Sequence, residues 1–92
     1  MSADDAVLLS TPALSAMFRL QWEEVQQAWV LLYPEGMVKL NGSAGEIIKR
    51  LDGKKNVTAL IAELEKDFET TGLQQDVLSF LDIAKQQGWV KA

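Results

Sequence analysis

The sequence predicts an α+β domain, in which a three-stranded antiparallel sheet is followed by three helices. The chain of 92 residues has the length of a single domain. Up to residue 38, apolar residues follow the two-residue period of strands, and from residue 39 onward they follow the longer period of helices. Strands and helices that occupy separate parts of a chain are typical of α+β proteins and do not suit a doubly wound sheet.

Two strands are predicted in the first part of the chain. Over residues 18–23, apolar and polar residues alternate strictly, which indicates a strand with one buried face. Residues 27–33 (QAWVLLY) are almost continuously apolar, as expected for a strand with a neighbour on each side. The second strand is therefore the middle one.

A tight turn and a third strand complete the predicted sheet. Residues 33–36 (YPEG) place a proline and a glycine where a β-turn favours them. Residues 37–40 (MVKL) form the third strand. Three consecutive strands joined by short connections give an antiparallel meander, with the first and third strands at its edges. Both edges stay open unless another part of the chain covers them.

The first helix is predicted over residues 44–51. Ser43 and Glu46 have the spacing of a capping box, in which each side chain binds a free amide of the first helical turn. The helix ends before Gly53, because glycine readily adopts the left-handed conformation that follows many helices. Its expected buried residues are Ala44, Ile47, Ile48 and Leu51.

Two further helices follow. Asn56 is predicted to cap the second, and Gly72 separates it from the third, which ends at Gly88. Their apolar residues recur at helical spacing and are Val57, Leu60, Ile61, Leu64, Phe68, Leu73, Val77, Phe80, Leu81 and Ala84. Residues 89–90 (WV) are expected to fold back on the core. This order of three strands and three helices is winged-helix-like.

The N-terminal residues differ from the rest of the chain. Residues 1–13 show no clear period and are predicted to form a flexible segment, in which Val7, Leu8 and Leu9 are able to dock on the domain. No internal repeat or low-complexity segment divides the remainder. Residues 14–92 are therefore expected to form one folded domain.

The composition disfavours several classes of function. Without cysteine or histidine, the chain lacks thiolate and imidazole groups, and a domain this small has little room to enclose a substrate, so an enzyme is not expected. The net charge of −4 argues against a nucleic-acid partner. No apolar run is long enough to span a membrane, and the acidic N-terminus is unlike a signal peptide. We therefore expect a cytoplasmic protein.

The third strand is the candidate binding surface. Its single charge gives little protection to an open strand edge. An incoming peptide strand would form main-chain hydrogen bonds there, with the amide of Val38 as an expected donor. The candidate peptide-binding residues are Met37, Val38, Lys39 and Leu40 on the strand and Leu73, Asp76, Val77 and Phe80 on the third helix.

Other interpretations of these residues stay open. Asp76 is expected to orient a basic or amide group of a ligand. The apolar peptide-binding candidates are equally suited to the hydrophobic core of the domain. Three tryptophans, Trp22, Trp29 and Trp89, are many for a chain of this length. Tryptophan is enriched at binding hot spots, although each of these residues also suits the core or its rim.

Several segments carry a family resemblance. Residues 31–41 (LLYPEGMVKLN) are the most specific, and they follow residues 18–24 (FRLQWEE) and precede residues 43–47 (SAGEI). Together with more general matches in the helices, the similarity covers residues 14–90. In these segments the chain resembles the PqqD family of pyrroloquinoline quinone biosynthesis.

The resemblance implies a peptide chaperone of the kind that serves pathways of ribosomally made, modified peptides. Such a protein binds the precursor peptide of pyrroloquinoline quinone and presents it to a radical SAM enzyme, which links a glutamate and a tyrosine of the peptide. The resemblance also implies that the leader of the precursor adds as a strand beside the third strand and packs on the third helix. It implies no catalytic residue, no metal and no cofactor.

Two alternatives stay open. A winged-helix DNA-binding regulator would need a basic recognition helix, but residues 73–87 carry only Lys85 against Asp76 and Asp82. The other alternative is an accessory subunit that forms a homodimer through its open strand edge, with or without strand exchange.

Overall fold

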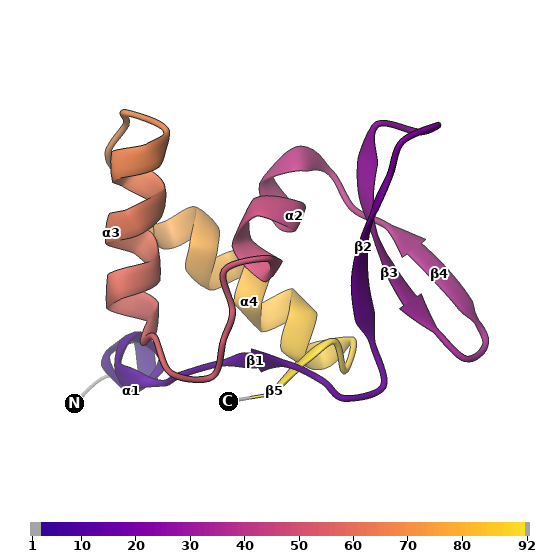
Figure 1. Cartoon of the computed structure of the whole chain (residues 1–92). Helices are drawn as coiled ribbons and strands as arrows, with labels where there is room; N and C mark the ends of the chain where they lie inside the picture. Colours follow the sequence, from indigo (N-terminus) through magenta and orange to yellow (C-terminus); the bar gives the residue numbers. More distant parts are fainter. Residues whose placement is uncertain (1–2, 92) are drawn as a thin grey trace.

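A three-stranded antiparallel sheet stands against a group of helices in the computed structural model, which describes residues 3–91 (Figure 1). The elements are α1 (Ala3–Leu9), β1 (Ala13–Leu14), β2 (Arg19–Glu23), β3 (Ala28–Tyr33), β4 (Gly36–Lys39), α2 (Gly42–Ile48), α3 (Val57–Asp67), α4 (Gln74–Gln86) and β5 (Val90–Lys91). The strand order β2-β3-β4 and the three following helices confirm the predicted α+β class.

The sheet packs on α2 through its middle strand. β3 pairs with β2 and β4, and Leu31 of β3 lies opposite Val38 of β4. Leu31 is fully buried, and it packs with Ala44 and Ile48 of α2. This cluster fixes the position of the sheet on α2, and with it the position of β4.

α2 approaches the sheet closely at Gly45. A Cβ atom added there would lie 2.3 Å from Cδ1 of Trp29 in β3. This distance is far below a van der Waals contact, so the observed packing of Trp29 requires a glycine on the facing turn of α2.

The beginning of α2 corrects one prediction. The helix starts at Gly42, and the side chain of Asn41 accepts a hydrogen bond of 2.8 Å from the amide of Ala44. Ser43 already lies inside the first turn, so the predicted capping box with Glu46 is wrong. α2 also ends at Ile48 instead of residue 51.

α3 and α4 follow the predicted pattern more closely. Asn56 caps α3 as predicted, by accepting a hydrogen bond of 2.8 Å from the amide of Ala59. Gly72, with φ of 78°, separates the two helices. The amide of Leu73, just before α4, donates to the carboxylate of Glu65 over 3.0 Å, which ties the start of α4 to α3.

The N-terminal segment contains a helix that the sequence did not predict. Val7 and Leu8 of α1 pack on the cluster formed by α3 and α4, as expected for residues able to dock, whereas Leu9 is 61% exposed. β1 then pairs with β5, and Val90 is buried, which confirms that the C-terminal tail folds back on the core. The flexibility of residues 1–13 stays a prediction.

Candidate functional site

The backbone groups on the open edge of β4 belong to Met37 and Lys39. β4 ends the sheet. The amide of Leu40 donates to the carbonyl oxygen of Trp29 over 2.9 Å, so these two opposite residues form a hydrogen-bonded pair. Along an antiparallel ladder, hydrogen-bonded pairs alternate with pairs that share no hydrogen bond. Val38 is therefore bonded to β3, whereas the N–H and C=O groups of Met37 and Lys39 point away from it. The prediction of an edge donor at Val38 is wrong by one position.

The side chains of β4 divide between the two faces of the sheet. Leu40 is buried on the helical face, and Val38 packs on the same cluster while partly exposed. Met37, which is 52% exposed, and Lys39 project from the opposite face. A strand added to β4 would thus meet the backbone of Met37 and Lys39 and the side chains of Val38 and Leu40.

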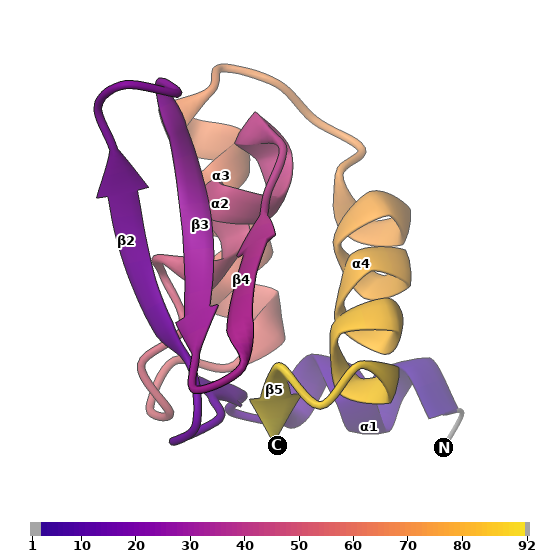
Figure 2. The same cartoon turned by 90° about the vertical axis from the view of Figure 1, so that its right-hand side faces the viewer.

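α4 lies on the open side of β4 (Figure 2), and the other predicted residues lie on this helix or, for Leu73, just before it. Val77 is buried in the cluster between α3 and α4, so it is mainly a core residue. Phe80 packs on both core clusters, and its ring lies 6.5 Å from that of Trp89. Leu73 and Phe80 are half-buried and Asp76 is exposed, so these three keep surface for a ligand.

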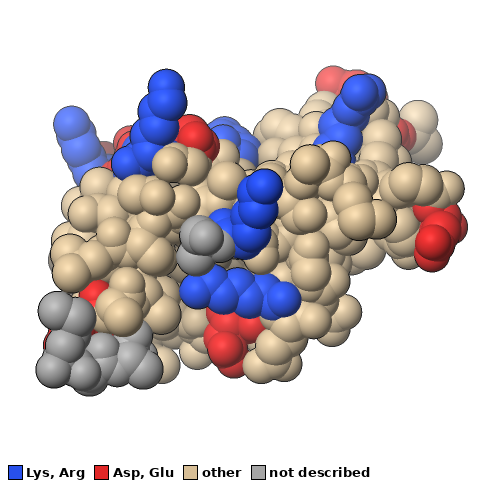
Figure 3. Space-filling model, turned by 90° about the horizontal axis from the view of Figure 1, so that it is seen from below, with Lys and Arg blue, Asp and Glu red and all other residues tan. Residues whose placement is uncertain are grey.

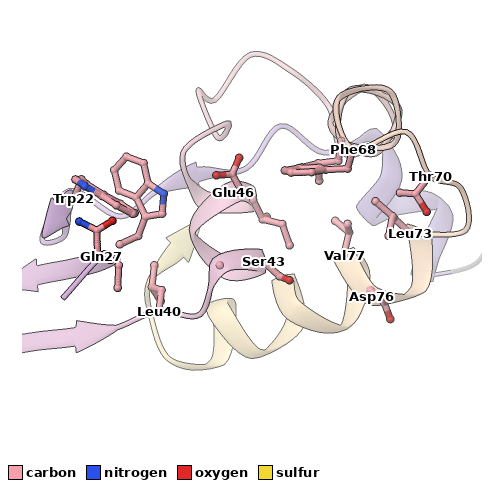
Figure 4. Close-up of a pocket in the computed structure, with 15 residues that line it drawn as sticks. Trp22, Gln27, Leu40, Ser43, Glu46, Phe68, Thr70, Leu73, Asp76 and Val77 are labelled. Carbon is pink, nitrogen blue, oxygen red and sulfur yellow. The ribbon is translucent and has the colours of Figure 1, made fainter. Parts of the chain in front are cut away.

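A cavity of about 570 Å³ lies beside the end of β4 (Figure 4). The predicted site residues that line it are Leu40, Leu73, Asp76 and Val77. The predicted residues outside its lining are Met37, Val38, Lys39 and Phe80. The structure therefore divides the predicted site into an open strand edge and an adjoining cavity.

The cavity reaches beyond the predicted groove, to the turn end of the β2–β3 hairpin. Figure 4 shows Trp22 on one side of α2 and Phe68 on the other, with Ser43 and Glu46 of α2 between them. Trp22 is 41% exposed and Phe68 is 52% exposed, which is high for large aromatic side chains. The helical spacing of Phe68 predicts a core residue. For Trp22, the only sequence signal of a binding role is the number of tryptophans in the chain.

The lining is mostly apolar and carries negative charge. Nine of the fifteen lining residues are apolar, and none is lysine or arginine. The carboxylate of Glu46 is paired with Lys49 and Arg50. The carboxylate of Asp76, by contrast, makes no hydrogen bond or ion pair with any residue in the described range 3–91.

Arg50 joins α2 to α3 beside this cavity. Its side chain is only 10% exposed and donates to the carboxylates of Glu46 over 2.8 Å, Glu63 over 3.2 Å and Asp67 over 2.9 Å. Its guanidinium also lies 5.7 Å from the centre of the Phe68 ring. The hydrogen bond from Arg50 lowers the pKa of Glu46, and the smaller effect of burial opposes it.

The lowered pKa of Glu46 predicts a pH-dependent contribution to stability. A carboxylate with a lower pKa in the folded state stabilises the fold above its unfolded pKa and loses that effect as the pH falls through its folded value. We expect wild type to exceed Glu46→Gln in unfolding free energy near neutral pH, with the difference shrinking from about pH 5 to about pH 3. Urea titrations across this range measure it, and a difference that grows on acidification would contradict the assignment.

Residues 3–91 form neither a cluster of metal ligands nor a membrane-spanning helix. No group of three or more acidic side chains is placed to hold a metal ion within this range. Each of its helices also lacks the length and apolar character of a membrane span.

The chain matches the model of a known protein family, described as Coenzyme PQQ synthesis protein D (PqqD), over residues 28–90. This span contains β3, β4 and the helices α2 to α4. The family match therefore includes both sides of the open edge and most of the cavity.

Relatives match nearly the whole chain. A protein from Pseudomonas paraeruginosa, named PqqA binding protein, is 51% identical over 83 residues, which cover 89% of this chain and 90% of that protein. A protein of the same name from Azotobacter vinelandii is 44% identical over 88 residues, which cover 95% of this chain and 96% of that protein.

A solved structure has a similar fold. It is the solution NMR structure of the PqqD truncation of Methylobacterium extorquens PqqCD, described as a functional, stand-alone recognition element for ribosomally synthesised and post-translationally modified peptides. It matches with a TM-score of 0.76 and 25% sequence identity, covering 96% of this chain and 99% of that one. The likeness thus extends over almost all of both chains.

Proposed function

The chain belongs to the PqqD family, and from this premise we propose that it is a peptide chaperone that binds PqqA, the precursor peptide of pyrroloquinoline quinone. The relatives named PqqA binding protein and the similar fold of a peptide recognition element support this proposal. In this account the chain binds and presents the peptide and carries out no chemical step.

The observation that carries the proposal is the open edge of β4. The unpaired N–H and C=O groups of Met37 and Lys39 are the groups that an added strand would pair with. Apolar side chains of that strand would pack beside Val38 and against Phe80 of α4, which is half-buried. The proposed binding mode is therefore strand addition between β4 and α4.

The proposed receiver of the bound peptide is the radical SAM enzyme of the same pathway, as the family resemblance implies. Strand addition holds only one segment of a peptide, so the rest would stay free to enter the active site of that enzyme. The proposed compartment is the cytoplasm, where a ribosomally made peptide is first available.

The net charge of −4 gives no support to the DNA-binding alternative. Figure 3 shows one face of the molecule, on which Lys and Arg side chains are separated by uncharged surface and accompanied by Asp and Glu. A DNA-binding surface would instead gather basic side chains into a stripe. A homodimer through β4 would use the same backbone groups as the peptide, so the two would compete.

Calorimetric titration of the chain with synthetic PqqA tests the proposal, with a scrambled peptide of the same composition as control. We expect one peptide per chain, a dissociation constant of about 10 μM or tighter, and no binding of the scrambled peptide. Equal binding of both peptides, or binding of neither, would contradict the proposal. Sedimentation of the chain alone and with peptide reports whether a dimer forms and whether peptide disperses it.

A further inference from the structure

The cavity beside β4 continues the line of the open strand edge. Leu40 directly follows β4 and forms part of the cavity wall. A strand paired with β4 advances about 3.3 Å with each residue, so its next one or two residues beyond Lys39 would reach the cavity. A peptide that pairs with the whole of β4 and continues straight past this end would pass the first turn of α2, where Gly42 and Ser43 line the cavity.

The size and the walls of the cavity suit large apolar side chains. Its volume of about 570 Å³ falls within the range of about 300–1,000 Å³ found for ligand pockets. Trp22 and Phe68 stand on opposite sides of it and keep about half of their surface exposed. Exposed aromatic residues around a concave surface are typical of binding hot spots.

The charge of the lining selects for a positive group. The cavity has no basic lining residue, and the carboxylate of Asp76 has no partner among the described residues. The face of Trp22 also attracts cations, whereas the ring of Phe68 already lies beside the guanidinium of Arg50. A lysine or arginine would therefore be preferred over an acidic residue near Asp76.

Resting on the proposed function, we infer that this cavity binds a large apolar side chain of the same peptide, just outside the segment that pairs with β4, and that Asp76 pairs with an adjacent lysine or arginine. The strand edge then supplies hydrogen bonds common to any peptide, and the cavity supplies sequence selectivity. Selectivity depends on Trp22, Phe68 and Asp76, none of which belongs to β4.

Two cavity variants and two matched controls test this inference by calorimetry with synthetic PqqA. Phe68→Ala and Asp76→Lys are each expected to weaken binding about tenfold. Ile83→Ala removes an α4 side chain that is 51% exposed and outside the cavity lining, and Asp82→Lys makes the same charge change on α4, also outside it. Both controls are expected to stay within about twofold of wild type.

Double-mutant cycles identify the peptide residues involved. Each aromatic or aliphatic residue of PqqA is changed to alanine and each basic residue to glutamine, and every peptide is titrated against wild type and the two cavity variants. One apolar position is expected to couple with Phe68→Ala, and one neighbouring basic position with Asp76→Lys, by at least about threefold. The coupling with Asp76 should weaken at high salt.

The outcomes separate this inference from the proposed function. If PqqA binds wild type and Lys39→Pro reduces binding, but both cavity variants bind as wild type does, the inference is overturned and strand addition stands. The inference is also overturned if the cavity variants and the control variants weaken PqqA binding equally. The same holds if neither cavity variant couples with any position of the peptide. Failure of wild type to bind PqqA would overturn the proposed function and the inference with it. Thermal unfolding of each variant verifies that it is folded.

Discussion

Gly45→Ala is expected to lower the free energy of unfolding by about 1–3 kcal/mol and to displace Trp29. The added methyl group would lie 2.3 Å from Cδ1 and 2.8 Å from Cβ of Trp29, so a simple rotation of the ring cannot relieve the contact. Either α2 moves away from β3 or Trp29 leaves its position. A domain of 92 residues has a total stability of about 5–14 kcal/mol, so the loss would be a large part of it.

Gly42→Ala is the matched control for this prediction. Gly42 lies in the same helix, and an added Cβ there meets no atom within 4 Å. Alanine favours a helix over glycine by about 1 kcal/mol, so Gly42→Ala is expected to be neutral or stabilising. Urea denaturation followed by tryptophan fluorescence measures both variants. Equal stability of the two would contradict the close packing of α2 on Trp29.

Lys39→Pro is expected to weaken PqqA binding about tenfold or more while leaving the fold intact. The amide of Lys39 points away from β3, and proline is tolerated at edge positions whose N–H faces solvent. The substitution removes a donor to the added strand and leaves a peptide carbonyl without its partner. Calorimetry measures the loss of binding, and circular dichroism verifies the fold.

Two neighbouring substitutions isolate the backbone effect. Lys39→Ala removes the same side chain but keeps the amide, and it should bind PqqA within about threefold of wild type. Val38→Pro instead removes an amide that bonds to Leu31, so its main effect should be a loss of stability. If Lys39→Pro binds as well as Lys39→Ala, the edge of β4 is not the site of strand addition.

Local sequence patterns predicted the sheet and α3 well because their determinants are local. The turn at residues 33–36 fixes the hairpin of β3 and β4, in which Tyr33 pairs with Gly36, and the alternation over residues 18–23 marks β2. Asn56 was the one strong capping residue near the start of α3. At α2 both Asn41 and Ser43 suit an N-cap, and the choice depends on where β4 ends, which local spacing does not determine.

The remaining features depend on contacts between distant parts of the chain. α1 has seven residues, too few for a clear helical period, and it is held by the packing of Val7 and Leu8 on the core. The cavity brings Trp22 of β2 to the same surface as Phe68 at the end of α3. Periodicity assigns Phe68 to the apolar stripe of its helix, but it does not tell how much of that stripe the neighbouring elements cover.

Amide hydrogen exchange of β4, measured with and without PqqA, tests the central claim most directly. In the free chain, Val38 and Leu40 should be protected by their bonds to β3, and Met37 and Lys39 should exchange rapidly. With saturating peptide, Met37 and Lys39 should become protected, while Val38 and Leu40 serve as internal references. If PqqA binds and the exchange of Met37 and Lys39 stays rapid, strand addition at β4 is contradicted.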